Sequence, residues 1–412
     1  PGSVSALAPQ GTPMLLHALP HGAAIPVPES ATTLNEVLEW HAARTPGRTH
    51  VLLYGEDEQV EALTYADLLH NARRIGAGLV ARGLAPQQAV ALMLPTGRDY
   101  LACFFGILLA GGIPVPIYPP ARLAQIEDHL RRHARILDNA QAVFIITVPQ
   151  AKTVAALLRA RVPSLAEIVT PDEIGAEPAP LLYRARAGDI AFLQYTSGST
   201  GDPKGVVLTH ANLLANLRAM GPAFRVTSED VFVSWLPLYH DMGLIGAWFG
   251  SLYFAMPLVL MSPLAFLARP ARWLQAISRH RGTLTAAPNF AYELCAKKLD
   301  DAELAGLDLY SLRLALNGAE PVSPATLESF IERFVPYGLQ PEAVTPVYGL
   351  AESSVGLAFP PLGRGPRIDA IGREAFVREA RAVPVDEGGS EVMRVPACGR
   401  ALPGHEIRIV DA

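Results

Sequence analysis

The sequence predicts a doubly wound α/β fold with mostly parallel strands, and three observations support this. Short apolar runs alternate with longer amphipathic stretches from about residue 32 onward. The short runs are rich in leucine and β-branched residues and lack the polar alternation of a half-exposed strand. The prolines, 36 of 412 residues, are scattered at the ends of these runs instead of forming a tract. This rhythm is typical of buried parallel strands joined by helices.

The elements follow one another without a fixed repeat. Residues 62–83 predict an amphipathic helix, and residues 89–95 predict a buried strand. The uncharged stretches 100–121 and 242–261 raise the question of a membrane span. Glycines and prolines interrupt both, so each predicts a buried helix followed by a core strand. Further elements are expected as a helix at 121–141 and as strands at 142–148, 191–195, 228–237, 256–261, 283–288, 312–318 and 343–350.

The chain is expected to comprise two α/β lobes and a different third part. Residues 1–3, Pro-Gly-Ser, resemble a tag remnant and are left out of the fold. The first lobe is expected over 4–190 and the second over 191–360. In residues 361–412, mixed charges and glycines replace the alternation of apolar runs and amphipathic stretches. Residues 398–411 then alternate between apolar and polar residues like a strand. An ending in mid-pattern indicates a fragment of a longer protein.

Composition narrows the classes of function. A net charge of −5 and an isoelectric point near 6.2 provide no basic field for a phosphate backbone, so nucleic acid is not expected as a partner. Cys103, Cys295 and Cys398 lie far apart without a CxxC spacing, which favours neither disulfides nor a zinc site. A cytoplasmic protein is therefore expected.

The most informative stretch is TSGSTGDPKG at residues 196–205, between two apolar runs. Glycines let backbone amides turn toward an anion, and Lys204 adds a mobile positive charge. A Walker A loop would need Ser or Thr after the lysine, whereas Gly205 stands there. A flexible surface loop is the alternative, but the pattern favours a polyphosphate-binding loop. The residues expected to bind are Thr196, Ser197, Gly198, Ser199, Thr200, Gly201 and Lys204.

With this loop the chain resembles the acyl-adenylate-forming superfamily, in which such a loop cradles the ATP phosphates. Three further motifs match in family order: SWLPLYHDMGLIG at 234–246, NGAEP at 317–321 and YGLAES at 348–353. The resemblance implies the large N-terminal domain of that fold, with two doubly wound sheets and the start of a distorted β-barrel. The family's small C-terminal lobe would lie beyond residue 412.

The longer sequences around these motifs are similar to those of the fatty acyl-AMP ligase branch of the superfamily. Residues 363–397 fall where that branch carries an insertion held to restrict CoA thioester formation. The resemblance therefore implies ATP-dependent activation of a fatty acid to an acyl-adenylate, with release of pyrophosphate and transfer to the phosphopantetheine of a carrier protein of a polyketide or nonribosomal peptide pathway. A fatty acyl-CoA synthetase and a non-catalytic nucleotide- or acyl-binding module remain the alternatives.

The resemblance implies roles for individual residues, and the repulsion between the two negatively charged reactants explains why these roles are needed. A carboxylate must approach a negatively charged α-phosphate, so cationic groups have to offset the repulsion. Lys204 would hold phosphates, Glu352 would bind a bridging Mg²⁺, and His240 would orient the carboxylate. The adenine slot would be walled by Asn317, Gly318, Ala319, Glu320, Tyr348, Gly349, Leu350 and Ala351. An acyl tunnel is expected to draw on Met242, Ile245, Trp248 and Phe290.

Overall fold

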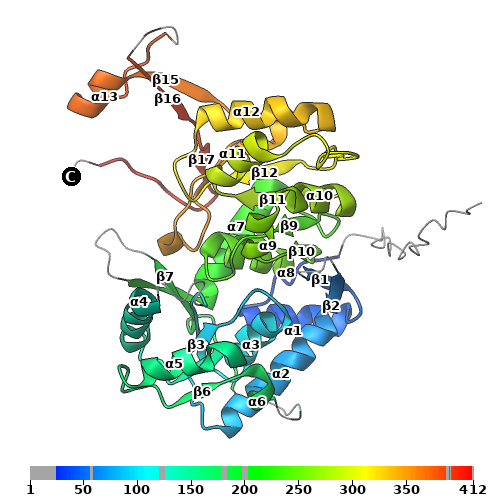
Figure 1. The fold of residues 1–412 in the computed structure, drawn as a ribbon, viewed down its shortest axis with the longest axis vertical. Helices are drawn as coiled ribbons and strands as arrows, with labels where there is room; N and C mark the ends of the chain where they lie inside the picture. The colour runs from blue at the N-terminus through cyan, green and yellow to red at the C-terminus, as the bar shows by residue number, and fades with distance from the viewer. Residues whose placement is uncertain are drawn as a thin grey trace, which may run out of the picture.

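The computed structural model describes residues 25–55, 59–119, 126–175, 177, 183–196, 203–386, 389 and 391–410. It has the two parallel sheets expected from the sequence, each with helices on both faces (Figure 1). The first lobe lies below the second in that view.

The larger sheet has seven strands and forms the body of the molecule. All neighbouring strands in it are parallel except the last pair, β1 and β2, which is antiparallel. Residues of the predicted runs form five of its members with shorter bounds than expected. The spatial order is β13 (Val344–Pro346), β12 (Leu314–Asn317), β11 (Leu284–Ala287), β9 (Phe232–Ser234), β10 (Leu258–Leu260), β1 (Thr49–Tyr54) and β2 (Val60–Thr64).

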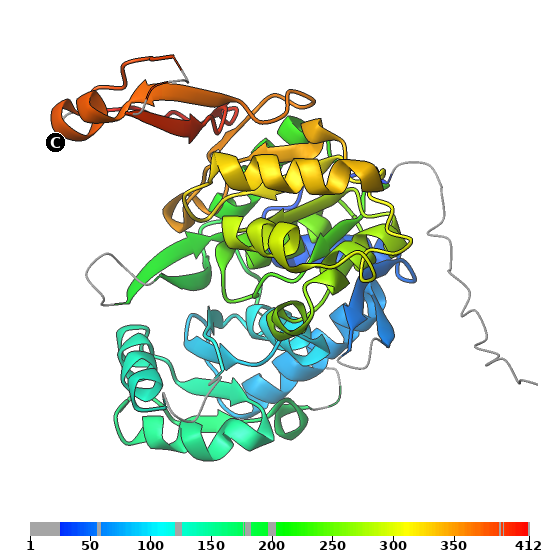
Figure 2. The ribbon, with the colours of Figure 1, turned by 45° about the horizontal axis from the view of Figure 1, so that its top comes forward.

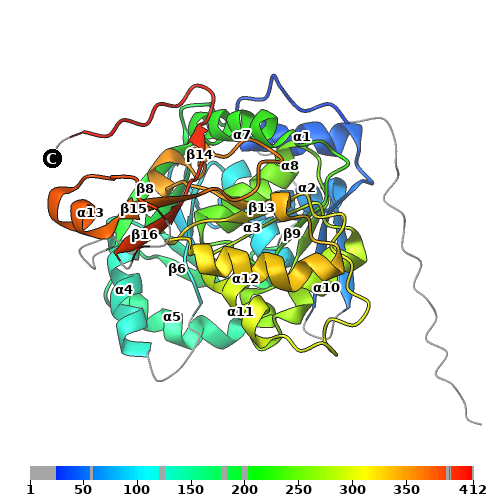
Figure 3. The same ribbon diagram turned by 90° about the horizontal axis from the view of Figure 1, so that it is seen from above.

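Helices cover this sheet on both faces, as Figure 3 shows from above. One layer contains α1 (Leu34–Arg44), α7 (His210–Phe224) and α8 (Gly250–Tyr253). The opposite layer contains α10 (Ala271–His280), α11 (Asn289–Lys298) and α12 (Pro324–Phe334), with α9 (Pro263–Ala268) preceding it in the chain.

The smaller sheet has four parallel strands in the order β4 (Ile113–Pro116), β3 (Ala89–Met93), β5 (Phe144–Thr147) and β6 (Glu167–Val169). Alternate residues of β3 face two different cores. Val90 and Leu92 pack in the main core with α3, whereas Ala91 and Met93 pack in a smaller core with residues of the opposite helices. The helices around this sheet are α2 (Tyr65–Ala81), α3 (Arg98–Leu109), α4 (Ile126–Asn139), α5 (Lys152–Arg159) and α6 (Pro171–Ile174).

A polar cap begins helix α7. Thr209 accepts a hydrogen bond from the Asn212 backbone N–H at 3.2 Å, and the Asn212 side chain bonds back to the Thr209 backbone. This reciprocal cap satisfies N–H groups that the first helical turn leaves free.

Both uncharged stretches divide as expected. The first forms α3, of 12 residues, and then β4. The second forms a π-helix, η3 (Met242–Phe249), which continues into α8 and is followed by β10. No helix in the described residues is long and apolar enough to cross a membrane.

The sheets divide the chain differently from the expected boundary at residue 190. β1 and β2 come from the first 64 residues, yet β1 pairs with β10 through Val51 and Leu258. An apolar run shows that a strand forms but not which strand it joins, since pairing partners can be distant in sequence. The second lobe therefore includes residues 49–64.

The last part of the chain forms an extension that projects from the body (Figure 2). β15 (Ile368–Gly372) pairs with β16 (Val392–Pro396), and α13 (Arg373–Glu379) lies between them in sequence. β14 (Ala358–Phe359) pairs with β17 (Arg400–Ala401), and no closed barrel forms among the described residues.

The strand predicted over 398–411 is limited to β17 within the residues described up to 410. Ile409 is 96% exposed, so the alternating apolar residues there have no packed surface to face. The remaining short elements are the β7 (Ile190–Thr196) and β8 (Lys204–Thr209) pair and the 3₁₀ turns η2 (Pro149–Ala151), η4 (Val335–Tyr337), η5 (Pro341–Ala343) and η6 (Ala351–Ser353).

Trp248, which the sequence placed in the acyl tunnel, belongs to the core instead. Its side chain is fully buried, and its indole Nε1–H donates to Nε2 of the buried His50 at 3.1 Å. Burial and the charge of His41 lower the pKa of His50 to about 3, which keeps the ring neutral and able to accept.

We predict that Trp248→Phe lowers the free energy of unfolding by about 1–3 kcal/mol, because it leaves the buried His50 nitrogen without its donor. Urea unfolding followed by circular dichroism measures the change. Trp235→Phe is the matched control, since the buried Trp235 Nε1 has no hydrogen-bond partner among the described residues. Equal losses in both variants would contradict the assigned role of the hydrogen bond.

Candidate active site

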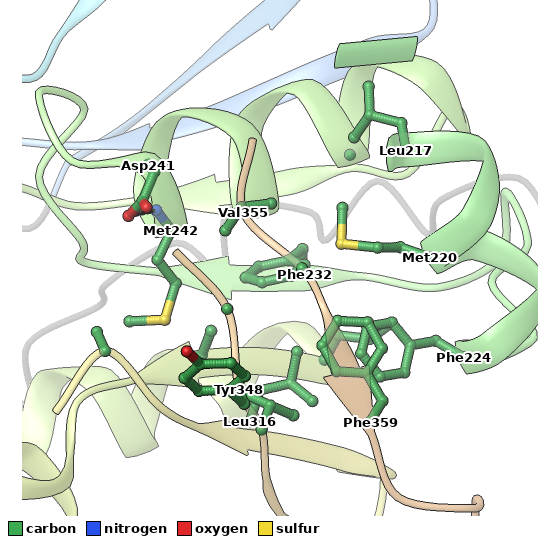
Figure 4. Close-up of a pocket in the computed structure, with 18 of the residues that line it drawn as sticks. Leu217, Met220, Phe224, Phe232, Asp241, Met242, Leu316, Tyr348, Val355 and Phe359 are labelled. Carbon is green, nitrogen blue, oxygen red and sulfur yellow. Dashed lines mark hydrogen bonds between the residues drawn. The ribbon is translucent and has the colours of Figure 1, made fainter. Parts of the chain in front are cut away.

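A cavity of about 330 Å³ extends from Phe232 and Leu284, the first residues of β9 and β11, to the carboxyl edge of the sheet at the ends of β12 and β13. In parallel α/β sheets this edge is the usual place for a ligand. The cavity is polar at one end, where His240, Asp241 and Glu352 line it, and apolar at the other. Figure 4 shows Asp241 on one side and Met220 and Phe224 on the other.

The two ends of the predicted phosphate-binding loop, Thr196 in β7 and Lys204 in β8, lie within the described residues. Thr196 lines the cavity, and its backbone is paired with that of the exposed Lys204. β8 also packs against η6, which carries Glu352. Both ends of the loop therefore lie at the polar end of the cavity. Ser197, Gly198, Ser199, Thr200 and Gly201 lie outside the described residues.

His240 lies between β9 and the π-helix η3. Its Nδ1 is 2.8 Å from Oδ1 of Asp241. Burial lowers the pKa of His240, but the hydrogen bond and charge of Asp241 outweigh this, so the pKa is raised overall. Below the raised pKa the imidazolium is the dominant form, and it is lost as the pH rises through that value. Because both side chains line the cavity, the pair can present a hydrogen-bond donor there.

The backbone before His240 is fixed by two side chains from other elements. The Tyr100 hydroxyl donates to the Leu238 carbonyl at 2.6 Å, and Gln194 Nε2 donates to the Tyr239 carbonyl at 2.8 Å. Buried carbonyls need such partners because water cannot reach them. The following π-helix is a form of helix found frequently at functional sites.

The first residues expected to wall the adenine slot lie at the ends of two neighbouring strands, and of Asn317, Gly318, Ala319 and Glu320 only Ala319 lines the cavity. Asn317 ends β12, and its Nδ2 donates to Asn289 Oδ1 at 3.4 Å. Ala319, two residues later, lines the cavity with a φ of 69°, an uncommon value for a residue with a Cβ. Glu320 points elsewhere, because its Oε1 accepts from the Phe290 backbone N–H at 2.7 Å. Gly318 packs tightly, since a Cβ there would lie 2.9 Å from Val347.

The YGLAES segment forms the facing wall. Tyr348, Gly349, Leu350, Ala351 and Glu352 all line the cavity. A Cβ at Gly349 would lie 1.7 Å from the Val355 carbonyl oxygen, so only glycine allows the turn to fold back this closely. The turn brings the Glu352 carboxylate to the same end of the cavity as Thr196 and His240.

Of the four residues expected to line the acyl tunnel, only Met242 lines the cavity. Ile245 and Trp248 are fully buried in the core. Phe290 is 42% exposed, and its ring lies 5.9 Å from that of Trp235. These three placements correct the expected acyl set. All four residues are apolar, so the sequence did not distinguish the faces that they occupy.

One side of the apolar wall comes from α7, which the sequence analysis did not single out. Its lining residues follow the i, i+3, i+4, i+7 spacing of one helix face: Leu217, Met220, Gly221 and Phe224. Phe224 stacks on Phe359 with ring centroids 4.3 Å apart. The spacing was visible in the sequence, but a helix that faces the core shows the same pattern. Asp241 was also missed, although its position after His240 was a direct signal.

Comparison with known proteins agrees with this geometry. The family model described as AMP-binding enzyme matches residues 38–412. The chain belongs to the AMP-binding enzyme family. This confirms the superfamily resemblance drawn from the four motifs.

Two similar AMP-binding proteins are the medium-chain-fatty-acid–[acyl-carrier-protein] ligase JamA of Moorena producens and the long-chain-fatty-acid–AMP ligase FadD26 of Mycobacterium bovis. JamA is 36% identical over 92% of this chain and 65% of its own length. FadD26 is 35% identical over 93% of this chain and 67% of its own length. The chain therefore spans about two thirds of the length of these relatives.

The fold is shared with a solved member of the family, the fatty acyl-adenylate ligase from L. pneumophila in complex with acyl adenylate and pyrophosphate. That structure matches with a TM-score of 0.83 and 33% identity, covering 90% of this chain and 64% of the solved chain. The expected large N-terminal domain of the acyl-adenylate-forming fold is thereby confirmed.

We predict that Asp241→Asn lowers the pKa of His240, because burial then acts without the opposing carboxylate. The charged ring should be lost at a lower pH than in the wild type. NMR titration of ¹⁵N-labelled histidines over roughly pH 5 to 9 measures this. Asp301→Asn, an exposed carboxylate paired with Arg333, serves as the control. An unchanged His240 titration in Asp241→Asn would refute the pairing.

Proposed function

We propose that this protein activates a fatty acid to its acyl-adenylate with ATP and releases pyrophosphate. One observation carries the proposal: a single cavity joins the His240, Asp241 and Glu352 end to an apolar wall built by α7. A fatty acid has the same division, with a charged head and an apolar tail. The names of the relatives and of the solved complex support the same reaction.

In this proposal, the carboxylate oxygen attacks the α-phosphorus of ATP, and the bond from that phosphorus to the β-bridging oxygen breaks. The main barrier is electrostatic, since two negatively charged groups have to meet in line. His240 would donate to the carboxylate and hold it at the mouth of the apolar wall. Lys204 would lie beside the phosphates that depart as pyrophosphate and offset their charge.

Mg²⁺ fits the donors at this end of the cavity. Glu352 supplies a carboxylate and Thr196 a hydroxyl, both oxygen ligands of the kind that Mg²⁺ prefers. Among the described residues no three His, Cys, Asp or Glu side chains gather into a metal cluster. One carboxylate with substrate phosphates is a common arrangement for Mg²⁺. The ion would neutralise phosphate charge, and Glu352 would hold it.

We further propose transfer of the acyl group to the phosphopantetheine thiol of a carrier protein. A side cavity of about 520 Å³ shares Thr196, His240, Asp241 and Ala351 with the first cavity. It opens beside Tyr118 and Arg132. It offers a separate approach to the reacting carbonyl for the thiol.

All three cysteines are free, which supports the proposal of a cytoplasmic protein.

We predict that the full-length protein releases pyrophosphate from ATP with fatty acids and that Gly246→Leu reduces kcat/KM at least about tenfold for long acids. Gly246 lines the cavity, and a Cβ there meets nothing within 4 Å, so the new side chain enters the space for the tail. Each methylene left out of an apolar site costs about fourfold. A coupled pyrophosphate assay across acids of increasing length measures the loss, which should be smallest for the shortest acids.

The control is Gly47→Leu, at an exposed turn glycine that also has nothing within 4 Å of its Cβ position. Mass spectrometry of products made with CoA or with a phosphopantetheinylated carrier separates the related activities. Rapid acyl-CoA formation would replace the proposal with a fatty acyl-CoA synthetase. Binding of ATP and fatty acid without pyrophosphate release would replace it with a non-catalytic binding module.

We predict that Glu352→Gln raises the Mg²⁺ concentration for half-maximal pyrophosphate release by at least about tenfold, because loss of outer-shell partners alone costs about 10- to 100-fold in metal affinity. A Mg²⁺ titration at saturating ATP measures this. Glu293→Gln, an exposed carboxylate paired with Lys297, should leave the titration unchanged. An unaltered Mg²⁺ requirement in Glu352→Gln would show that Glu352 does not bind the metal ion.

A further inference from the structure

Two cavities meet at the apolar end of the candidate active site. The 330 Å³ cavity and another of about 650 Å³ both have Phe254 and Val226 in their walls. The larger one lies between residues 25–30, Trp40 and the segment 226–228. The two cavities therefore share a wall at the apolar end of the candidate acyl site.

Phe254 is the larger of the two shared side chains and lies directly against the α7 wall. It follows α8, and its backbone N–H donates to the Gly250 carbonyl at 3.1 Å. A Cβ at Gly221 would lie 2.1 Å from the tip of the Phe254 ring, so the ring occupies the space that glycine leaves on α7. The ring of Tyr253 packs edge-on against it, with centroids 4.9 Å apart. These contacts fix Phe254 as a partition.

Hydrogen bonds hold the far wall of the 650 Å³ cavity, which is called the second cavity below, in place. Arg218 Nη2 donates to the carbonyls of Glu29 and Ala31, at 2.9 and 2.6 Å. The Ile25 backbone N–H donates to Ser228 Oγ at 2.9 Å. These bonds hold residues 25–31 across the space beyond Phe254 without filling it. Apolar side chains supply much of its lining: Ile25, Pro26, Val27, Trp40, Val226 and Phe254.

We propose that Phe254 sets the upper limit on the length of the fatty acid and that the second cavity accepts the terminal methylenes of longer acids once this ring is removed. The inference rests on the proposed function and adds to it the residue that determines chain length. The tail runs from His240 along α7 toward Phe254, and its last carbon stops at the ring. Apolar lining makes the space beyond the ring favourable for further methylenes.

The test compares wild type, Phe254→Ala and Phe254→Leu in the full-length protein, with saturated acids of increasing length. For acids longer than the wild-type optimum, kcat/KM in Phe254→Ala should rise about fourfold with each added methylene until the second cavity is full. Phe254→Leu should fall between the other two. Phe376→Ala, at a 42% exposed phenylalanine of α13, is the control and should keep the wild-type length profile.

A binding measurement accompanies the kinetics and does not depend on turnover. Acyl sulfamates of adenosine, stable mimics of the acyl-adenylate, are titrated by calorimetry with tails of the same lengths. Tighter binding of the long-tailed mimics by Phe254→Ala supports the proposal. An unchanged length profile in Phe254→Ala and Phe254→Leu, with both variants folded by circular dichroism, overturns it.

Failure of the proposed function gives a different result. In that case the wild type itself releases no pyrophosphate with any acid and binds none of the mimics, and the chain-length proposal falls with it. A folded, active wild type whose length preference is insensitive to Phe254 refutes the chain-length proposal alone.

Discussion

The fixed backbone of residues 237–241 is the constraint on which the site depends. Tyr100 comes from α3 of the first lobe and Gln194 from β7, and each holds one carbonyl of this segment. Burial raises the pKa of Tyr100, so its hydroxyl stays a neutral donor. Loss of the Tyr100 bond would leave the buried Leu238 carbonyl without a partner, which typically costs about 1–3 kcal/mol. The orientation of His240 is thus set by contacts outside the reacting groups.

The second organising feature is the separation of polarity along one cavity. Groups that can bind anions come from turns at the ends of β9, β12, β13 and the β7–β8 pair, whereas the apolar wall comes from a helix face. Turns can expose backbone and charged groups, but a packed helix presents side chains of one kind along its length. The fold therefore keeps the charged groups at the sheet edge and the apolar wall inside the core.

The sequence predicted what local pattern determines. The helix within 100–121 and the strand at 89–95 were found because glycines and prolines divide these apolar runs into segments of helix and strand length, and the four motifs led to the family because residue types and order both matched. The tunnel was less predictable. Met242 lines the cavity but Ile245 and Trp248 do not, because the helix carrying them is apolar on every face and a π-helix shifts the usual register.

The pairing of β1 with β10 has a consequence for how the chain is assembled during synthesis. Val51 and Leu258 lie side by side in the sheet although about two hundred residues separate them, and the whole four-stranded sheet is encoded in that interval. As the ribosome delivers the chain, β1 and β2 have a free edge until β10 emerges, while the four-stranded unit between them can close first. The seven-stranded sheet therefore cannot be completed until its last strand, β13, has been synthesised.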